Sequence, residues 1–478
     1  MRRRRVGEQR RCARFVTPGP EELRLADGNR MSGIIAARTL HEYPRGAHRW
    51  GLLGLTVVAT ILASYEFQLA PILSLLLPYL HLSQVGYGYF ITFAVLISGI
   101  SAFFGGPLAD RYGRVILIDI CLGLTVVLVF CNLFITNIVS FVIIRTLMSI
   151  VAGTMAGAGA ALMRDMSPRV DRALAFGLLT IGPVGANFLA NRIAAWTLPI
   201  YHTWQSQIWI TGILGLAMFV PIALWLKDLS ADLRLRIFRT EIASMEARGV
   251  KLKAAELPSS TNDAFARLLR HPEIWIQVVG INANLTLYFA ITAFGPLMFT
   301  QAFKYPPAEA AAMNSNFWLW NLAILVLTGF VSDRLQIRKP IAIIGAALTI
   351  GLLTWWVPSF TTGGLPRGEM AVVAAILGGC LAIGYVPWAA HFSETLEEVS
   401  PALQATGWAF FGLVARAWAG LSAPLTLYIA KEFGWQAWIK VSIVGMGIYI
   451  IALLITRGIR QEDASQAADA AATANAAP

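Results

Sequence analysis

Twelve long apolar segments constrain what this chain can fold into. They lie near residues 50–73, 85–107, 114–134, 138–162, 173–196, 206–226, 273–299, 311–331, 340–358, 369–390, 405–430 and 434–456. A bilayer with a hydrocarbon core of about 30 Å requires roughly 20 apolar residues per helix. No alternation of apolar and polar residues typical of strands competes with this interpretation. We therefore predict an all-α, polytopic membrane protein with twelve transmembrane helices, arranged as two six-helix bundles.

The composition supports a chain that is surrounded by lipid. Charged residues make up only 14% of it, whereas soluble domains carry about 25%. The four cysteines, Cys12, Cys121, Cys131 and Cys380, are too dispersed to indicate a disulfide framework, and we expect neither a disulfide nor a metal site. Motifs of metalloproteases, serine hydrolases and nucleotide-binding P-loops are all missing from the sequence. We expect no enzymatic activity, no cofactor and no ATP-driven transport.

Lysine and arginine in the connecting segments indicate the orientation in the membrane. Beyond the N-terminal arm, the loops on the side of the N-terminus carry nineteen of these residues, and the loops on the other side carry three. Positive loops stay in the cytoplasm, so we predict a multi-pass protein of the inner (plasma) membrane with both termini cytoplasmic. A secretory signal is not expected, because the first apolar segment is too long.

The remaining segments divide the chain into five parts. We expect a disordered basic arm over 1–49, a six-helix bundle over 50–227, a cytoplasmic linker with an amphipathic helix over 228–272, a second bundle over 273–457 and a disordered tail over 458–478. The net charge of +11 does not indicate a nucleic-acid partner, since much of it is concentrated in the arm. Either Met1 or Met31 could be the first residue of the protein.

Two related charged loops indicate an internal repeat. The first, "GPLADRYGR", contains Asp110 and Arg111, and the second, "GFVSDRLQIRK", contains Asp333 and Arg334. Each loop falls between the second and third apolar segments of its half of the chain. A Ser-Pro pair also precedes the fifth and the eleventh segments. Duplicated six-helix halves are one architecture of secondary transporters, in which the substrate binds between the halves near the middle of the membrane.

The first charged loop, its weaker copy and the layout of six plus six segments resemble the major facilitator superfamily. The partial match of "RTLMSIVAG", beginning at Arg145, resembles the fourth-span pattern of this family, with Ser149 in place of a glycine. The resemblance implies solute transport by alternating access, for which a monomer suffices. It also implies that Asp110 caps the eleventh helix, as part of a gate in the cytoplasmic loops. The residues expected in this gate are Gly106, Asp110, Arg111, Gly113, Arg114, Asp333 and Arg334. Alternatively, these charges only direct the topology.

Charged residues inside the apolar segments are candidates for function, because burying a charge in lipid is costly. Glu66 lies well inside the first segment, where a low dielectric favours a protonated carboxyl group, so we expect it to couple transport to protons. Arg145 in the fourth segment is its expected partner. A purely structural ion pair between the two is the alternative.

Arg416 in the eleventh segment is the leading candidate for substrate binding. Its guanidinium keeps its proton and can bind a carboxylate with two hydrogen bonds. Arg145 and Arg416, from opposite halves, could clamp an anion, although either could instead have a structural partner. Amides and aromatic rings suited to a ring-bearing solute are expected at Asn282, Asn284, Tyr288, Trp318 and Asn321. Contacts between helices are the competing interpretation for each of these.

Two transport functions follow from these residues. The first is a proton-coupled symporter that moves a small organic anion, such as a carboxylate or an aromatic acid, and it is favoured by Arg145 and Arg416. The second is a proton-driven antiporter that exports drug-like amphipathic compounds. The partial match of "GPVGA" (182–186) to an antiporter pattern favours this alternative. Both predict a small-molecule substrate, protons and the lipid bilayer as the partners.

Overall fold

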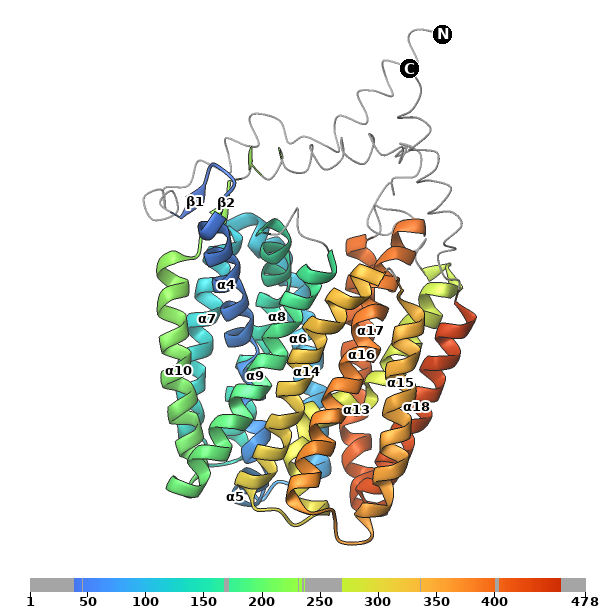
Figure 1. The fold of residues 1–478 in the computed structure, drawn as a ribbon. Helices are drawn as coiled ribbons and strands as arrows, with labels where there is room; N and C mark the ends of the chain where they lie inside the picture. The colour runs from blue at the N-terminus through green and yellow to red at the C-terminus, as the bar shows by residue number, and fades with distance from the viewer. Residues whose placement is uncertain are drawn as a thin grey trace.

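The structure is a computed structural model. It describes residues 38–44, 46–166, 172–230, 232–233, 236, 269–335, 337–399 and 404–456 (Figure 1). The amphipathic helix predicted in the linker, the tail after 457 and most of the N-terminal arm fall outside these residues. Within the described part, long helices dominate and run side by side between two ends of the molecule.

Each predicted apolar segment contains one long helix. The first group is α4 (Gly46–Ala63), α6 (Gln84–Tyr112), α7 (Arg114–Cys131), α8 (Ile138–Met166), α9 (Arg172–Tyr201) and α10 (Trp204–Trp225). The second is α13 (Pro272–Ala302), α14 (Pro307–Leu335), α15 (Lys339–Trp356), α16 (Arg367–Val399), α17 (Gln404–Phe433) and α18 (Trp435–Ile455). In the described part, 11 helices are long and apolar enough to cross a membrane, and α9 is the remaining long helix. The prediction of an all-α membrane fold is confirmed.

The first transmembrane segment is broken in its middle. After α4, the chain continues as a 3-10 helix, η1 (Tyr65–Ile72), and then as the short helix α5 (Leu73–Tyr79). A proline inside a helix, such as Pro71, usually produces a kink. Instead, the tighter 3-10 winding includes both Pro71 and the backbone of Glu66. A 3-10 stretch of this length inside a helix is uncommon and often marks a functional hinge.

Large apolar side chains cover the outside of the helices. Ile100 on α6, Leu224 on α10 and Val444 on α18 are each more than half exposed. A soluble protein would bury most residues of this kind, whereas a membrane protein exposes them to lipid tails. The outer surface therefore fits a bilayer.

The two ends of the molecule differ in the turns that they carry. We call one end the linker face; it carries the turn between α6 and α7 and two short strands, β1 (Thr39–Leu40) and β2 (Asp228–Leu229). We call the other end the opposite face; it carries the turns from α5 to α6 and from α13 to α14. The orientation predicted from the lysines and arginines would place the linker face in the cytoplasm.

β1 and β2 form a parallel pair in which Thr39 is opposite Asp228. The backbone N–H of Asp228 donates to the carbonyl of Arg38 at 2.9 Å, and the N–H of Ser230 donates to that of Leu40 at 2.9 Å. The side chain of Arg38 also pairs with Asp119 on α7. Part of the segment assigned above to a disordered arm is therefore ordered, because these partners satisfy its polar groups.

Candidate functional site

The two groups of helices contact each other through α6 against α17 and α9 against α14. Near the opposite face, the hydroxyl of Thr92 donates to the carbonyl of Gly420 at 2.6 Å. One turn away, a side chain added at Gly88 would lie 2.6 Å from the Cα of Pro424, so only glycine allows this approach. The two groups are thus in close contact near the opposite face.

An amide pair joins α9 and α14 in the same region. Asn314 donates from Nδ2 to Oδ1 of Asn191 at 3.1 Å, and both side chains are fully buried. Asn191 also donates to the carbonyl of Asn187 on its own helix at 2.8 Å. A buried hydrogen bond between helices is expensive to break, because the donor and the acceptor are then both buried without a partner. This pair therefore favours the contact between the two groups of helices.

Tyr288 on α13 and Trp318 on α14 meet inside the second group. Their ring centroids lie 5.3 Å apart, and the rings are nearly perpendicular at 83°. Trp318 is fully buried, and its indole Nε1 has no hydrogen-bond partner among the described residues. Tyr288 is half-buried. Of the six residues predicted to bind substrate, these two are shown in direct contact.

The two asparagines predicted on α13 point in different directions. Residues two positions apart on a helix are separated by about 200°. Asn284 shares a face with Tyr288, four residues later, whereas Asn282 shares a face with Thr286. Asn282 donates to the carbonyl of Val278 at 2.8 Å, while neither polar atom of Asn284 has a partner among the described residues. The structure therefore does not bring Asn282 and Asn284 into one site.

Asn321 takes part in the packing of two helices. Its Nδ2 donates to the carbonyl of Gly378 on α16 at 2.8 Å, while its Oδ1 has no partner among the described residues. At Gly378 an added side chain would lie 2.1 Å from the carbonyl oxygen of Phe317, so α14 and α16 touch here. Asn321 can thus stabilise the helix pair and still offer an acceptor.

Arg416 lies on α17 beside the first group of helices. A Cβ added at Gly99 on α6 would lie 3.9 Å from its Cδ. Its Nη1 donates to the carbonyl of Gly412, one turn earlier, at 3.4 Å. No carboxylate among the described residues pairs with it, although the side chain is half-buried. A guanidinium at this depth with one long hydrogen bond has capacity left for an anion.

Arg145 and Glu66 are less fully described. Arg145 is buried on α8, with 9% of its surface exposed, and its Nη1 lies 3.5 Å from the sulfur of Met148. It has a further interaction as well. The side chain of Glu66 falls outside the described residues. Among the described residues, no hydrogen bond joins Arg145 to Arg416, so the proton-coupling pair and the anion clamp stay predictions.

The first charged loop is bound to the start of the linker. Gly113 separates α6 from α7 with φ of 95°, a conformation that favours glycine. The N–H of Arg114 donates to the carboxylate of Asp228 at 3.1 Å, so Asp228 caps α7. The guanidinium of Arg111 lies 5.3 Å from the ring of Tyr112 and is exposed. Gly106 and Asp110 lie on α6, but the surroundings of Gly106 and the side chain of Asp110 fall outside what the structure describes.

The second charged loop is organised by Arg338, which is not among the predicted gate residues. Arg338 pairs with Asp333 at 2.8 Å and, through Nε, with Glu394 of α16 at 3.0 Å. It also donates to the hydroxyl of Ser332 at 2.8 Å. Arg334 is exposed. Asp333 thus belongs to a network on the linker face, and the residue that organises this network is Arg338.

Sequence reasoning missed several residues of the interior. Asn191 follows Asn187 by one helical turn in an apolar segment, and this spacing could have indicated a buried polar face. Trp418 donates to the hydroxyl of Thr286 at 3.0 Å and so joins α17 to α13. Tyr385 on α16 packs beside Leu325 and Trp388, and nothing in its sequence neighbourhood distinguishes it from an interfacial tyrosine.

The helix layout and the paired charged loops agree with one known family. The model of the Major Facilitator Superfamily matches residues 54–424. This chain belongs to that superfamily. The resemblance seen in the sequence is thereby confirmed, and the chain is a multi-pass membrane transporter of a small molecule rather than an enzyme.

Two relatives and one solved structure are similar to this superfamily member. It is 23% identical over 358 residues to a gallate transporter of Pseudomonas putida, covering 71% of this chain and 76% of the relative. It is 25% identical over 354 residues to a probable 4-methylmuconolactone transporter of Cupriavidus pinatubonensis, covering 71% and 74%. A D-xylose-proton symporter has the same fold, with a TM-score of 0.62 and 14% identity over 86% of this chain and 97% of that one.

Proposed function

We propose that this transporter moves a small organic anion, a carboxylate or an aromatic acid, together with protons across the plasma membrane. Alternating access between the two bundles would expose the site to each side in turn. We infer further that the linker face is cytoplasmic, that a proton gradient drives transport without a cofactor, and that a monomer forms the whole pathway.

Arg416 carries this proposal. Its side chain, on a transmembrane helix, passes beside Gly99 of the other bundle with its Cδ, and the hydrogen bond of 3.4 Å from its guanidinium to Gly412 is weak. A positive charge inside the membrane without a carboxylate partner is energetically costly, unless a bound ligand supplies the negative charge. An anionic solute between the bundles would supply it. The rings of Tyr288 and Trp318 provide apolar surface for a ring-bearing solute.

The relatives favour the same chemistry. One is named for gallate, an aromatic acid, and the other for a methylmuconolactone. Proton coupling is supported by the fold shared with a proton symporter and by the broken helix around Glu66. A carboxyl group in an apolar transmembrane segment can bind and release a proton during the cycle.

Uptake by proteoliposomes tests the proposal. The purified full-length chain is reconstituted, and the uptake of radiolabelled benzoate, hydroxybenzoates and gallate is measured with and without an inward proton gradient. We expect uptake of at least one of these acids, with the gradient increasing its accumulation. Arg416→Gln should abolish this uptake, whereas Arg416→Lys should retain part of it, because it keeps the charge but loses the planar fork.

Arg192→Gln is the matched control. Arg192 is also an arginine in a transmembrane helix, but its guanidinium is stacked on Trp196 at 4.6 Å from the ring centroid. Its replacement should leave uptake close to that of the unmodified protein. If Arg416→Gln takes up these acids as fast as the unmodified protein does, the anion site is refuted.

Proton-driven export of amphipathic compounds remains the second candidate. Gly182 on α9 packs so closely on α4 that an added side chain would lie 2.6 Å from the side chain of Thr60. Pro183 follows directly inside the same helix. This contact agrees with the glycine-proline pattern that favours an antiporter. Gradient-driven efflux of a cationic dye from the same proteoliposomes, without uptake of any acid, would favour this function.

A further inference from the structure

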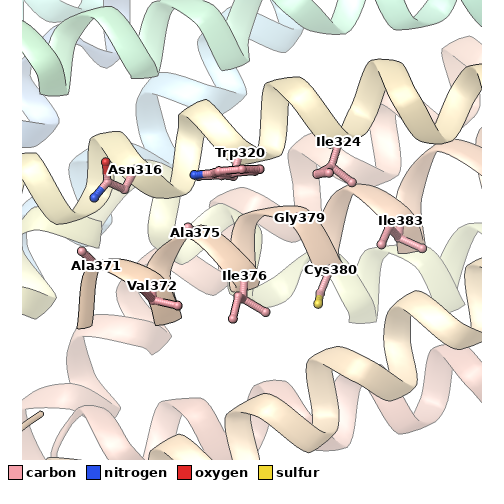
Figure 2. Close-up of a pocket in the computed structure, with 10 residues that line it drawn as sticks. All are labelled: Asn316, Trp320, Ile324, Ala371, Val372, Ala375, Ile376, Gly379, Cys380 and Ile383. Atoms are coloured by element: carbon pink, nitrogen blue, oxygen red, sulfur yellow. The ribbon is translucent and has the colours of Figure 1, made fainter. Parts of the chain in front are cut away.

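A groove of about 510 Å³ runs along the outside of the second bundle, between α14 and α16 (Figure 2). Asn316, Trp320 and Ile324 line it from α14, each one helical turn after the other. Trp320 is 50% exposed, whereas its neighbours Trp318 and Asn321, on the inner side of α14, are buried. The groove therefore opens away from α13, toward the lipid.

The shape of the groove fits one hydrocarbon chain. Its lining on α16 extends from Ala371 to Ile383, a rise of about 18 Å. Small residues, Ala375 and Gly379 among them, leave the space between the two helices empty. The contact of Gly378 with Phe317 closes the groove on its inner side. The result is a long, narrow channel with one open side.

Charged groups of both signs lie where the groove begins. Arg367 precedes Ala371 by one turn, at the opposite face, and its side chain is 69% exposed. Its Nε pairs with Glu309 of α14 at 3.1 Å, and its two Nη groups have no partner among the described residues. Glu369, on the same turn of α16, is exposed. A headgroup with both a negative and a positive charge complements this set.

One polar side chain lies between these charges and the apolar part of the groove. Figure 2 shows Asn316 at the same end as Ala371, with Ile324 and Ile383 at the other end. Its amide has no partner among the described residues. Ala371 lies about 6 Å deeper along the helix than Arg367. In a bilayer this step leads from the headgroups to the edge of the hydrocarbon core, where phospholipids carry their ester carbonyls.

We propose that this groove is a binding site for a zwitterionic phospholipid with an ammonium group, such as phosphatidylethanolamine. Arg367 binds the phosphate, Glu309 and Glu369 attract the ammonium, and Asn316 donates to an ester carbonyl. One acyl chain lies along Trp320 toward Ile383. The site lies outside the transport pathway and does not depend on the identity of the solute.

Native mass spectrometry tests this site directly. The full-length protein is equilibrated in detergent with equal amounts of phosphatidylethanolamine, phosphatidylglycerol and phosphatidylcholine of identical chains, and the lipids that remain bound are counted. We expect one phosphatidylethanolamine to be retained preferentially. Ala375→Phe fills the groove, and Arg367→Gln removes the phosphate contact. Arg367→Gln should lower this retention about fivefold, the effect of losing an exposed charge contact. Ala375→Phe should lower it at least as much, because its ring occupies the space of the acyl chain.

Ile344→Phe on α15 is the control, since Ile344 is also exposed to lipid (54%) but lies outside the groove. It should retain phosphatidylethanolamine as the unmodified protein does. Arg367 is a surface residue, so its replacement should not impair folding even if Ala375→Phe does. Unchanged retention in Arg367→Gln, or equal retention of the three lipids by the unmodified protein, would overturn the proposal.

Discussion

At the scale of single residues, Asn284 differs from the other buried amides that the structure describes. Among the buried side chains that the structure describes, Asn284 has both polar atoms without a hydrogen-bond partner. Burying an amide in this way costs about 1–3 kcal/mol. Such a residue lowers stability unless a bound molecule completes its hydrogen bonds, which supports a role for Asn284 in binding the solute.

We expect Asn284→Leu to make the empty protein more stable and a poorer transporter. Leucine has a similar size and needs no hydrogen bonds, so the melting temperature without solute should rise. The KM for the transported acid should increase about tenfold if one hydrogen bond to the solute is lost. Thermal unfolding and proteoliposome uptake measure the two effects.

Asn321→Leu provides the contrast. Asn321 donates to Gly378 in the contact of α14 with α16, so this change removes a hydrogen bond of the protein itself. Its melting temperature should fall. If Asn284→Leu also melts at a lower temperature and transports normally, Asn284 serves the packing of helices and not the solute.

At the scale of helices, the close pair of α6 and α8 depends on two glycines. A Cβ at Gly153 would lie 2.1 Å from the carbonyl oxygen of Ser98, and one at Gly105 would lie 2.1 Å from that of Thr154. Gly153 is the last residue of the fourth-span pattern in the sequence. Ser149, in the place of the other glycine, donates to the carbonyl of Arg145 at 3.0 Å on its own helix.

Gly153→Ala should therefore separate α6 from α8. We expect the free energy of unfolding to fall by about 1–3 kcal/mol, the usual cost of overpacking. Gly159→Ala on the same helix is the matched control, because nothing lies within 4 Å of a Cβ at that position. Thermal unfolding in detergent compares the two variants, and equal melting temperatures would show that the helix pair can adjust.

The turn between α14 and α15 allows a second comparison. Arg338 contacts Asp333, Glu394 and Ser332, whereas Arg334 is exposed. Arg338→Gln should lower the free energy of unfolding by about 1–3 kcal/mol, because two partly buried carboxylates lose their partner. Arg334→Gln should have little effect. A larger loss in Arg334→Gln than in Arg338→Gln, by thermal unfolding, would contradict this assignment.

The sequence predicted the helices well because their length and apolar character are local properties. The break around Glu66 was not predictable, since Pro71 alone allows either a kinked helix or a 3-10 segment. The partner of Asp333 was not predictable either. The motif emphasises the adjacent arginine, but the chain turns after Leu335 and brings Arg338 back toward Asp333 and Glu394.

At the scale of the whole molecule, the two bundles meet near the opposite face through the amide pair of Asn191 and Asn314 and the contact of Thr92 with Gly420. Tyr87 and Phe294 add an edge-to-face ring contact there, with centroids 6.2 Å apart. Alternating access requires these contacts to break when the site opens to that side. Their strength therefore sets the balance between the two states.

Asn191→Ala should shift this balance toward opening at the opposite face. Losing a hydrogen bond of about 1 kcal/mol changes the ratio of the states roughly fivefold. A Tyr87→Cys substitution reports the opening, because Tyr87 is buried in the contact (5% exposed). Its labelling by a membrane-impermeant maleimide should become about fivefold faster in the presence of Asn191→Ala.

Asn187→Ala is the control for this experiment. Asn187 donates to the carbonyl of Pro183 on its own helix at 3.0 Å and does not join the bundles through this hydrogen bond. It should leave the labelling rate unchanged. Equal acceleration by both changes would indicate a general loosening of α9.

The candidate site was less predictable than the fold because it depends on how the helices are rotated. Asn282 and Asn284 look equivalent in the sequence, yet they lie on different faces of α13. The choice between them depends on contacts with distant residues, such as that of Tyr288 with Trp318. For the same reason, no local signal identified Asn314 as the partner of Asn191.

The pairing of β1 with β2 brings the beginning and the end of the first six helices together. A unit whose ends adjoin can be excised, joined or copied without stretching the chain. Duplication of such a unit adds a second set of six helices, while the two ends of the first set stay paired. This geometry offers a physical route by which a half-length ancestor could become a chain of twelve helices.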